Sequence, residues 1–321
     1  MTKIRSRDAS RIQDRRGDSS GGGGLGDLLK GGLGGSSSGG GGIQIPGGGG
    51  GLGGLVKGGG GLVGLLVVAA MIFLPKLLGG ASSAPVGVGQ GASGGAAEAT
   101  RGGDGEACSS DLEQQLCGAT NDVADYWIEQ LPLSFGTDYI DTQTVFFSGS
   151  TRTGCGMASS QTGPFYCPAD SLVYFDLDFL TQLQSTFGAT GDLAAQYIVA
   201  HEYGHHVQNV LGINAQMHQA QQQDPSRANQ YSIALELQAD CFAGAWARDA
   251  RDRDLFDDPS EIEEALNAAA AVGDDRIQQQ TQGRVDPESW THGSSAQRVQ
   301  WFRVGFDTGD PQRCTTFSEV R

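Results

Sequence analysis

Apolar residues recur with two different spacings from about residue 106 onward, and each spacing predicts one kind of element. Five stretches place an apolar residue every three or four positions, as an amphipathic helix does: about 111–130, 192–211, 229–251, 260–271 and 296–305. Short apolar runs around 144–147 and 172–175, with turn-rich sequence between them, predict strands. The pattern does not decide whether the Gln-rich stretch 216–223 is helix or loop. The fold class that follows is α+β, mainly helical, with a small β-sheet.

The first hundred residues follow neither spacing. Residues 1–16 are charged, and from 17 to 57 the chain is rich in Gly and Ser with isolated Leu and Ile. Such composition buries too little apolar surface to offset the entropy of ordering, so we expect residues 1–57 to be disordered. Gly, Ala and Ser also dominate 79–105, which we expect to be a flexible linker leading to a folded domain at 106–321.

An uncharged apolar stretch separates these two regions. Residues 58–75 carry no charge, and we expect residues 58–78 to form one transmembrane helix. Basic residues are concentrated before this stretch, so the positive-inside rule predicts a cytoplasmic amino terminus and a domain outside the cytoplasmic membrane. A cleaved signal peptide is the alternative, because small residues follow at 81–84.

Charge divides the chain in the same way. Up to Gly60 there are eight Lys and Arg against four Asp and Glu, a net +4, so the remainder carries −20 to reach the total of −16. A basic front suits an anionic membrane surface. The acidic remainder would repel nucleic acid, which we therefore exclude as a partner.

All six cysteines follow the apolar stretch, which favours disulfides in a compartment outside the cytoplasm. Sequence alone does not choose among the possible connectivities. The pairs closest in sequence are Cys108 with Cys117 and Cys155 with Cys167, and Cys241 with Cys314 remains by elimination. Six reduced, buried thiols in a cytosolic protein are the alternative.

The strongest chemical signal is the pentapeptide HEYGH at 201–205, inside a predicted helix. His201 and His205 are four residues apart, so they lie one turn apart on one helical face and can bind the same ion. Glu202 is about 100° around the helix, where it would miss the metal but reach a water beside it. This pattern predicts a hydrolytic site with one Zn²⁺, two histidine ligands and Glu202 as the general base.

A third protein ligand has to come from another part of the chain. The metzincin continuation of the motif is excluded, because Gln208 and Leu211 stand where it requires glycine and histidine. Glu236 and Asp240 lie one turn apart in the next predicted helix. We assign Glu236 as the third ligand and Asp240 as the acceptor for the N–H of a ligating histidine. The alternative for both carboxylates is a solvated helix face.

His292 is the remaining histidine with a candidate role. It precedes a predicted helix, and from a loop it could stabilise the oxyanion that forms during hydrolysis. Arg298, near the start of that helix, is expected to pair with an acidic residue and to be structural. His206 points about 100° away from His205 around the helix, and His218 lacks a partner at ligand spacing. The predicted folded domain at 106–321 contains no GxSxG serine elbow, and a Walker A loop is absent from the sequence.

The chain closely resembles the bacterial neutral zinc metallopeptidase family in three segments: AHEYGHHVQNVLG, LELQADCFAGAWA and THGSSAQRVQWFRVGF. The likeness extends to the QDRRG opening, the Gly-rich and apolar stretches and GPFYCPADSLVYFDLDF, so it covers nearly the whole chain. The resemblance implies a zincin-like fold, in which the HExxH helix packs beside a small sheet and a second helix supplies a glutamate. Its roles fall on His201, Glu202, His205 and Glu236. By analogy, the strand near 173–175 is expected to be the sheet edge that aligns a peptide.

We therefore expect a membrane-anchored zinc metallopeptidase, an endopeptidase that acts on a peptide or protein outside the membrane and contacts the lipid bilayer through one helix. The alternative is a zinc-containing binding or scaffolding module with little peptidase activity, against which the intact Glu202 argues. A structural zinc is a third possibility. Structural zinc sites usually have four protein ligands and are rich in cysteine. The set His201, His205 and Glu236 has three ligands and no cysteine.

Overall fold

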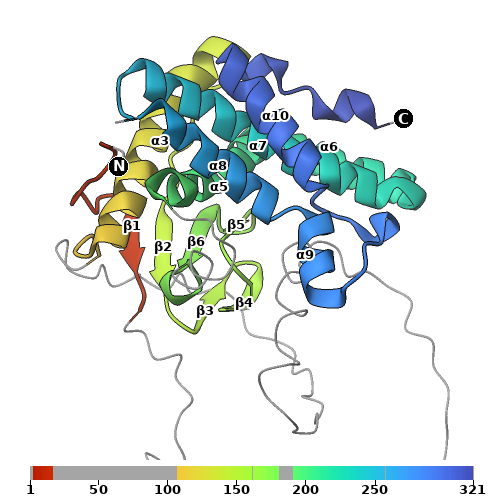
Figure 1. The fold of residues 1–321 in the computed structure, drawn as a ribbon, viewed down its shortest axis with the longest axis horizontal. Helices are drawn as coiled ribbons and strands as arrows, with labels where there is room; N and C mark the ends of the chain where they lie inside the picture. The colour runs from red at the N-terminus through yellow and green to blue at the C-terminus, as the bar shows by residue number, and fades with distance from the viewer. Residues whose placement is uncertain (1–2, 17–106, 161, 181–190, 257, 321) are drawn as a thin grey trace, which may run out of the picture.

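The computed structural model describes residues 3–16, 107–160, 162–180, 191–256 and 258–320, and Figure 1 shows their arrangement. The helices are gathered on one side of a small sheet. Three expected features, the disordered stretch at 17–57, the transmembrane helix at 58–78 and the linker at 79–105, lie outside these ranges. Among the helices that are described, none is both long enough and apolar enough to span a membrane.

All five predicted helices are confirmed within a few residues, and the described part of the chain contains further helices, among them α6 and α9. The Gln-rich stretch forms a helix of its own, because Gly212 adopts a left-handed conformation (φ 73°) and separates it from the helix before it. The polar helix α9 was not predicted. The helices are α3 (Asp111–Phe135), α5 (Asp192–Val210), α6 (Ile213–Gln223), α7 (Ala228–Asp252), α8 (Ile262–Ala271), α9 (Asp274–Gln282) and α10 (Ser295–Thr308).

The main sheet has four strands in the order β1-β2-β6-β5, and a separate hairpin lies beside it. β1, β2 and β6 are parallel, whereas β5 is antiparallel to β6. The strand predicted as a peptide-aligning edge is β6, which is hydrogen-bonded on both sides, so that prediction is wrong. The strands are β1 (Ile12–Asp14), β2 (Thr144–Phe147), β5 (Phe165–Cys167) and β6 (Leu172–Asp176), with the hairpin β3 (Ser150–Thr153) and β4 (Gly156–Ser159).

Residues 3–16 are part of the folded domain, which corrects the prediction of disorder for this segment. They contribute β1 at one edge of the sheet, beside α3 in Figure 1, and bury Ile4 and Ala9. The segment has no helical or strand periodicity of its own. Its order comes from partners far along the chain, which a local pattern does not reveal.

Helix α5 occupies the centre of the domain. It contacts β5 and β6 of the sheet and the helices α3, α7 and α8. Most of its side chains are buried, including Tyr197 and Tyr203. This position places the HEYGH segment in the interior of the fold.

Helices α7 and α10 approach so closely that only glycine fits at two points. A Cβ on Gly244 of α7 would lie 2.0 Å from the carbonyl oxygen of Phe302, and one on Gly305 of α10 would lie 1.9 Å from a carbonyl oxygen of α7. Asp240 lies one turn before Gly244, and Arg298 one turn before Phe302. The close approach therefore brings these two charged residues together.

The three disulfides are those expected from spacing and elimination, and no cysteine is free. Two of them close short loops, whereas the third joins α7 to the C-terminal segment across 73 residues. The alternative of six reduced thiols is wrong, because all six cysteines are in disulfides. The pairs are Cys108–Cys117, Cys155–Cys167 and Cys241–Cys314.

Candidate metal centre

Two histidines of α5 and one glutamate of α7 converge on a single point. The ligand atoms of His201, His205 and Glu236 all lie within 4.8 Å of one another. His201 Nε2 is 3.2 Å from one carboxylate oxygen of Glu236, and His205 Nε2 is 3.5 Å from the other. All three residues are buried, and only 2 % of the Glu236 surface is exposed. The structure thus brings together the three residues that the sequence assigned as ligands.

The close approach of α5 to α7 depends on the fourth residue of the motif. A Cβ on Gly204 would lie 3.1 Å from the Cα of Ala239, which is tighter than nearly all real contacts. Glycine between the two histidines therefore lets α7 carry Glu236 up to them.

The donor set fits a catalytic zinc ion. Two imidazole nitrogens and one carboxylate make three protein ligands, which leaves a coordination position for water or substrate. Burial opposes ionisation of Glu236. The charge of His205 and hydrogen bonds from both imidazoles outweigh it, and they hold the Glu236 pKa well below its ordinary value. Glu236 is therefore a carboxylate, the form that binds a cation.

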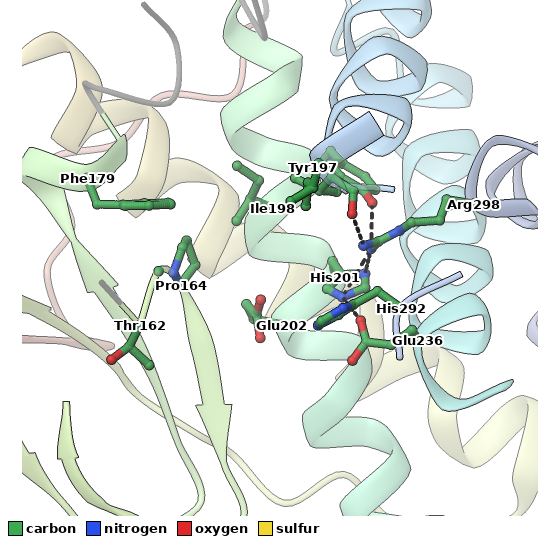
Figure 2. Close-up of a pocket in the computed structure, with 13 residues that line it drawn as sticks. Thr162, Pro164, Phe179, Tyr197, Ile198, His201, Glu202, Glu236, His292 and Arg298 are labelled. Carbon is green, nitrogen blue, oxygen red and sulfur yellow. Dashed lines mark hydrogen bonds and ion pairs between the residues drawn. The ribbon is translucent and has the colours of Figure 1, made fainter. Parts of the chain in front are cut away.

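Glu202 lies on α5 beside the cluster but faces a pocket (Figure 2). It is only 4 % exposed, and its Oε2 has no hydrogen-bond partner among the described residues. Burial raises its pKa, although the charges of His201 and His205 act against that rise. A buried carboxylate with an unpaired oxygen and a raised pKa suits a general base that needs a water as its partner.

His201 is oriented by a buried carboxylate. Its Nδ1 is 2.9 Å from Asp240 Oδ1, so Nδ1–H donates there, and Nε2 is the nitrogen that can bind a metal once it has lost its proton. Burial lowers the His201 pKa, but Asp240 and Glu236 together raise it to about 9. Metal binding at this histidine therefore displaces a proton and weakens as the pH falls.

Asp240 is itself held by two other buried side chains. Arg298 approaches it through Nε at 2.8 Å and Nη2 at 2.9 Å, and the Tyr197 hydroxyl donates to it at 2.5 Å. Arg298 thus has the acidic partner expected of it, and it also lines the pocket in Figure 2. Tyr197 was not identified from the sequence.

His205 has an orienting partner that sequence reasoning missed. Its Nδ1 is 2.8 Å from the Gln208 side-chain oxygen, and the Gln208 amide donates to the backbone of Leu235 at 2.7 Å. In the sequence, Gln208 served only to exclude the metzincin motif, which requires glycine at that position. Its position three residues after His205, on the same helical face, was the available signal.

His292 lies against the cluster and lines the same pocket. Its Nδ1 is 3.1 Å from Asp274 Oδ1, and Asp274 Oδ2 accepts the backbone N–H groups of residues 291, 292 and 293. Burial lowers the pKa of His292, but Asp274 and the charge of Glu236 more than compensate and raise it overall. Nδ1 is therefore occupied by Asp274 and by the Thr291 hydroxyl 3.0 Å away, and Nε2 is the nitrogen that can contact a substrate. Asp274 was not identified from the sequence.

The pocket is a cavity of about 110 Å³ between α5 and the segment before β5. Ile198 and Glu202, one turn apart on α5, form one wall, and Pro164 and Phe179 lie opposite them in Figure 2. Val272, one residue after α8, and Ile277 of α9 add further apolar surface. The arrangement places a mainly apolar recess directly beside the candidate metal ligands.

Comparisons with known proteins assign the chain to a family. The family model described as "Putative neutral zinc metallopeptidase" matches residues 34–317. The uncharacterized protein YpfJ of Escherichia coli K12 is 50 % identical over 196 residues, which cover 61 % of this chain and 68 % of that protein. The uncharacterized protein Mb2605 of Mycobacterium bovis is 48 % identical over 219 residues, which cover 64 % and 71 %. No solved structure matches the chain.

Proposed function

Because the chain belongs to the family described as "Putative neutral zinc metallopeptidase", we propose that it is a zinc-dependent endopeptidase. The observation that carries this proposal is the convergence of His201, His205 and Glu236 beside a pocket that the unpaired oxygen of Glu202 faces. A zinc ion held by the first three residues would supply Lewis-acid activation of water and of the peptide carbonyl.

The chain's own residues divide the remaining work. Glu202 takes the proton from the attacking water and later delivers it to the departing amine. His292, fixed through Nδ1 by Asp274, donates from Nε2 to the oxyanion that forms on the cleaved carbonyl. Asp240 keeps His201 in the tautomer that presents Nε2, and Gln208 does the same for His205.

The pocket supports a preference for a large apolar side chain next to the cleaved bond. Ile198, Val272, Ile277 and Phe179 surround the space beside Glu202, so burial of an apolar side chain is favourable there. The substitution Ile198→Arg should shift cleavage toward acidic residues. Mass-spectrometric mapping of products from a mixed peptide library would show it. Unchanged product ends would refute the assignment of this wall.

We also propose that the domain acts outside the cytoplasm and is associated with the membrane through the apolar stretch at 58–78. Three disulfides support an oxidising compartment. A cytoplasmic amino terminus is not part of this proposal, because residues 3–16 pack on the same domain.

The proposed reaction is tested with the full chain, since a fragment starting at residue 106 would lack β1. Wild type should hold one zinc by elemental analysis and cleave casein. Glu202→Gln should keep zinc and lose cleavage by about 10²–10⁴-fold, whereas Glu236→Ala should lose zinc. Glu129→Gln, an exposed carboxylate of α3, is the matched control. If wild type and Glu202→Gln both bind zinc and neither cleaves any of a varied substrate set, the binding-module alternative is favoured.

A further inference from the structure

The N-terminal arm, residues 3–16, is attached to the domain along its whole length. β1 pairs in register with β2, Ile12 opposite Thr144. Further backbone hydrogen bonds join Lys3 to Leu255 at 2.9 Å and Ser6 to Gln114 at 3.0 Å. The arm therefore contacts separate parts of the chain, among them the segment after α7, α3 and the sheet.

Several of the arm's basic residues meet acidic residues of the domain. Each of these contacts joins opposite charges across a long separation in sequence, so the net +4 of the front and the acidity of the remainder compensate each other locally. The pairs are Arg5 with Asp192 (3.1 Å), Arg11 with Asp125 (3.1 Å) and Asp141 (3.2 Å), and Arg16 with Glu113.

Two of the contacts fall on the helix that carries the HEYGH segment. The side-chain amide of Gln196, which is fully buried, donates to the Ile4 carbonyl at 3.0 Å. Asp192, the first residue of α5, is the carboxylate that pairs with Arg5. Gln196 lies five residues before His201, so the arm holds α5 in the two turns that precede the candidate metal ligands.

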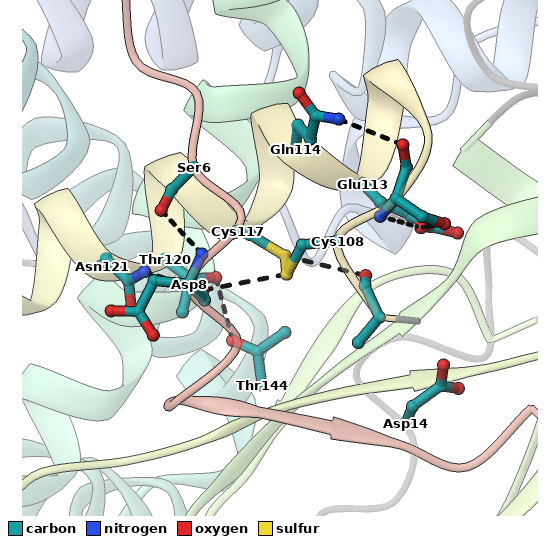
Figure 3. The surroundings of a disulfide bond; sticks show 12 residues. Ser6, Asp8, Asp14, Cys108, Glu113, Gln114, Cys117, Thr120, Asn121 and Thr144 are labelled. Carbon is teal, nitrogen blue, oxygen red and sulfur yellow. Dashed lines mark hydrogen bonds between the residues drawn. A yellow bond between two sulfur atoms is a disulfide. The ribbon is translucent and has the colours of Figure 1, made fainter. Parts of the chain in front are cut away.

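The surface beneath the arm is shaped to receive it. A Cβ on Gly118 of α3 would lie 2.8 Å from both the Cα and the N of Arg5, so the arm's backbone occupies the space that any other residue would fill. Figure 3 shows the neighbouring contacts, where the carbonyl of Asp8 accepts from Asn121 at 3.0 Å near the Cys108–Cys117 disulfide. The recess, the acidic residues and the edge of β2 that β1 covers together form the binding surface for the arm.

We propose that this surface is a dedicated site for a basic, extended peptide segment, that residues 3–16 of the same chain occupy it in the working protein, and that the docked arm positions the N-terminal half of α5. It follows that residues 3–16 and 107–320 lie in one compartment. A single membrane crossing between residues 58 and 78 would separate them and is incompatible with docking within one molecule. The inference does not depend on peptidase activity.

Gly118→Ala tests docking without altering the arm or the metal ligands. Alanine favours a helix more than glycine does, so in a chain without residues 1–16 the substitution should raise the Tm or leave it unchanged. In the full chain it should lower the Tm by several degrees and weaken zinc retention against a chelator. A rise in Tm in both backgrounds would overturn the proposal.

Hydrogen exchange of the full chain keeps the test valid if the shortened chain does not fold. The amides of Thr144 and Arg15, which donate to Arg11 and Phe146 across the β1–β2 pair, should exchange slowly. Gly118→Ala should accelerate Arg15 exchange selectively. Rapid exchange of Arg15 in the wild type would show that the arm is not docked.

Thiol labelling on intact cells tests the compartment. Ser10 of the arm and Ser226 of the domain are both exposed, so Ser10→Cys and Ser226→Cys are matched probes for a membrane-impermeant maleimide. Equal labelling of both, or of neither before lysis, supports a shared compartment. Labelling of position 226 without position 10 would overturn it. Labelling of neither would refute the proposed export but not the docking.

Discussion

Asp240→Leu, alone and combined with Arg298→Met, separates two roles of one buried carboxylate. Asp240 is fully buried and accepts hydrogen bonds from His201, Tyr197 and both Nε and Nη2 of Arg298. Removing it alone leaves the Arg298 guanidinium buried without its countercharge. We expect a loss of about 3–5 kcal/mol in the free energy of unfolding. The Tyr197 hydroxyl also loses the acceptor of its hydrogen bond, which adds about 1–3 kcal/mol.

The double variant replaces the ion pair with apolar side chains of similar size. Because desolvation of both charges is no longer required, most of the loss caused by the single substitution should be recovered. Zinc affinity should behave differently. His201 has lost the acceptor for its Nδ1–H in both variants, so both should bind zinc about 10–100-fold more weakly than wild type.

Urea unfolding of the zinc-free proteins measures the free energy of unfolding, and competition with a chelator measures the zinc affinity. Arg303→Met, an exposed arginine of the same helix, is the control for the loss of an arginine. A double variant as unstable as the single one would refute the argument about the uncompensated charge. Wild-type zinc affinity in both variants would refute the orienting role of Asp240.

Three further predictions concern the framework around the site. Gly244→Ala should lower the Tm, because an overlap at 2.0 Å from the Phe302 carbonyl oxygen costs about 1–3 kcal/mol and exceeds the helix-propensity gain of about 1 kcal/mol; a rise in Tm would contradict this. Replacing Cys241 and Cys314 together by serine should cost about 2–5 kcal/mol, measured by urea unfolding under oxidising conditions, and reducing agent should then have less further effect than in wild type. Burial opposes ionisation of Asp274, but its hydrogen bonds lower its pKa below the ordinary 3.8. The stability that ionised Asp274 gives to the folded protein is therefore present above pH 3.8 and is lost as the pH falls through the lowered pKa. The stability of Asp274→Asn and wild type should therefore converge in acid, and a difference that persists unchanged would refute the assignment.

Local sequence determined the elements that carry the chemistry. The apolar periodicity of α5 and α7 lies within each segment, so it could be recognised without knowing what either helix contacts. The one-turn spacing of His201 and His205 is likewise a property of a single helix. Glu236 and Asp240 could be assigned for the same reason, once a third ligand was sought in the next helix.

Tertiary structure decided which groups meet. Periodicity identifies the apolar face of a helix but not the helix that covers it, so the contact of Arg298 with Asp240 depends on the glycine-mediated approach of α10 to α7. The role of Gln208 in orienting His205 depends on a carbonyl of α7. These contacts are long-range, and each is specified by packing rather than by a motif.

The N-terminal arm is the clearest case of this division. Its sequence lacks periodicity and is rich in charge, which is typical of a disordered segment. Its order arises because β2 offers an open edge, Gly118 leaves space for its backbone, and acidic residues from several elements surround its arginines. The sequence determined the charges and the strand-forming residues. Only the fold brought their partners to one surface, because those partners are far apart along the chain.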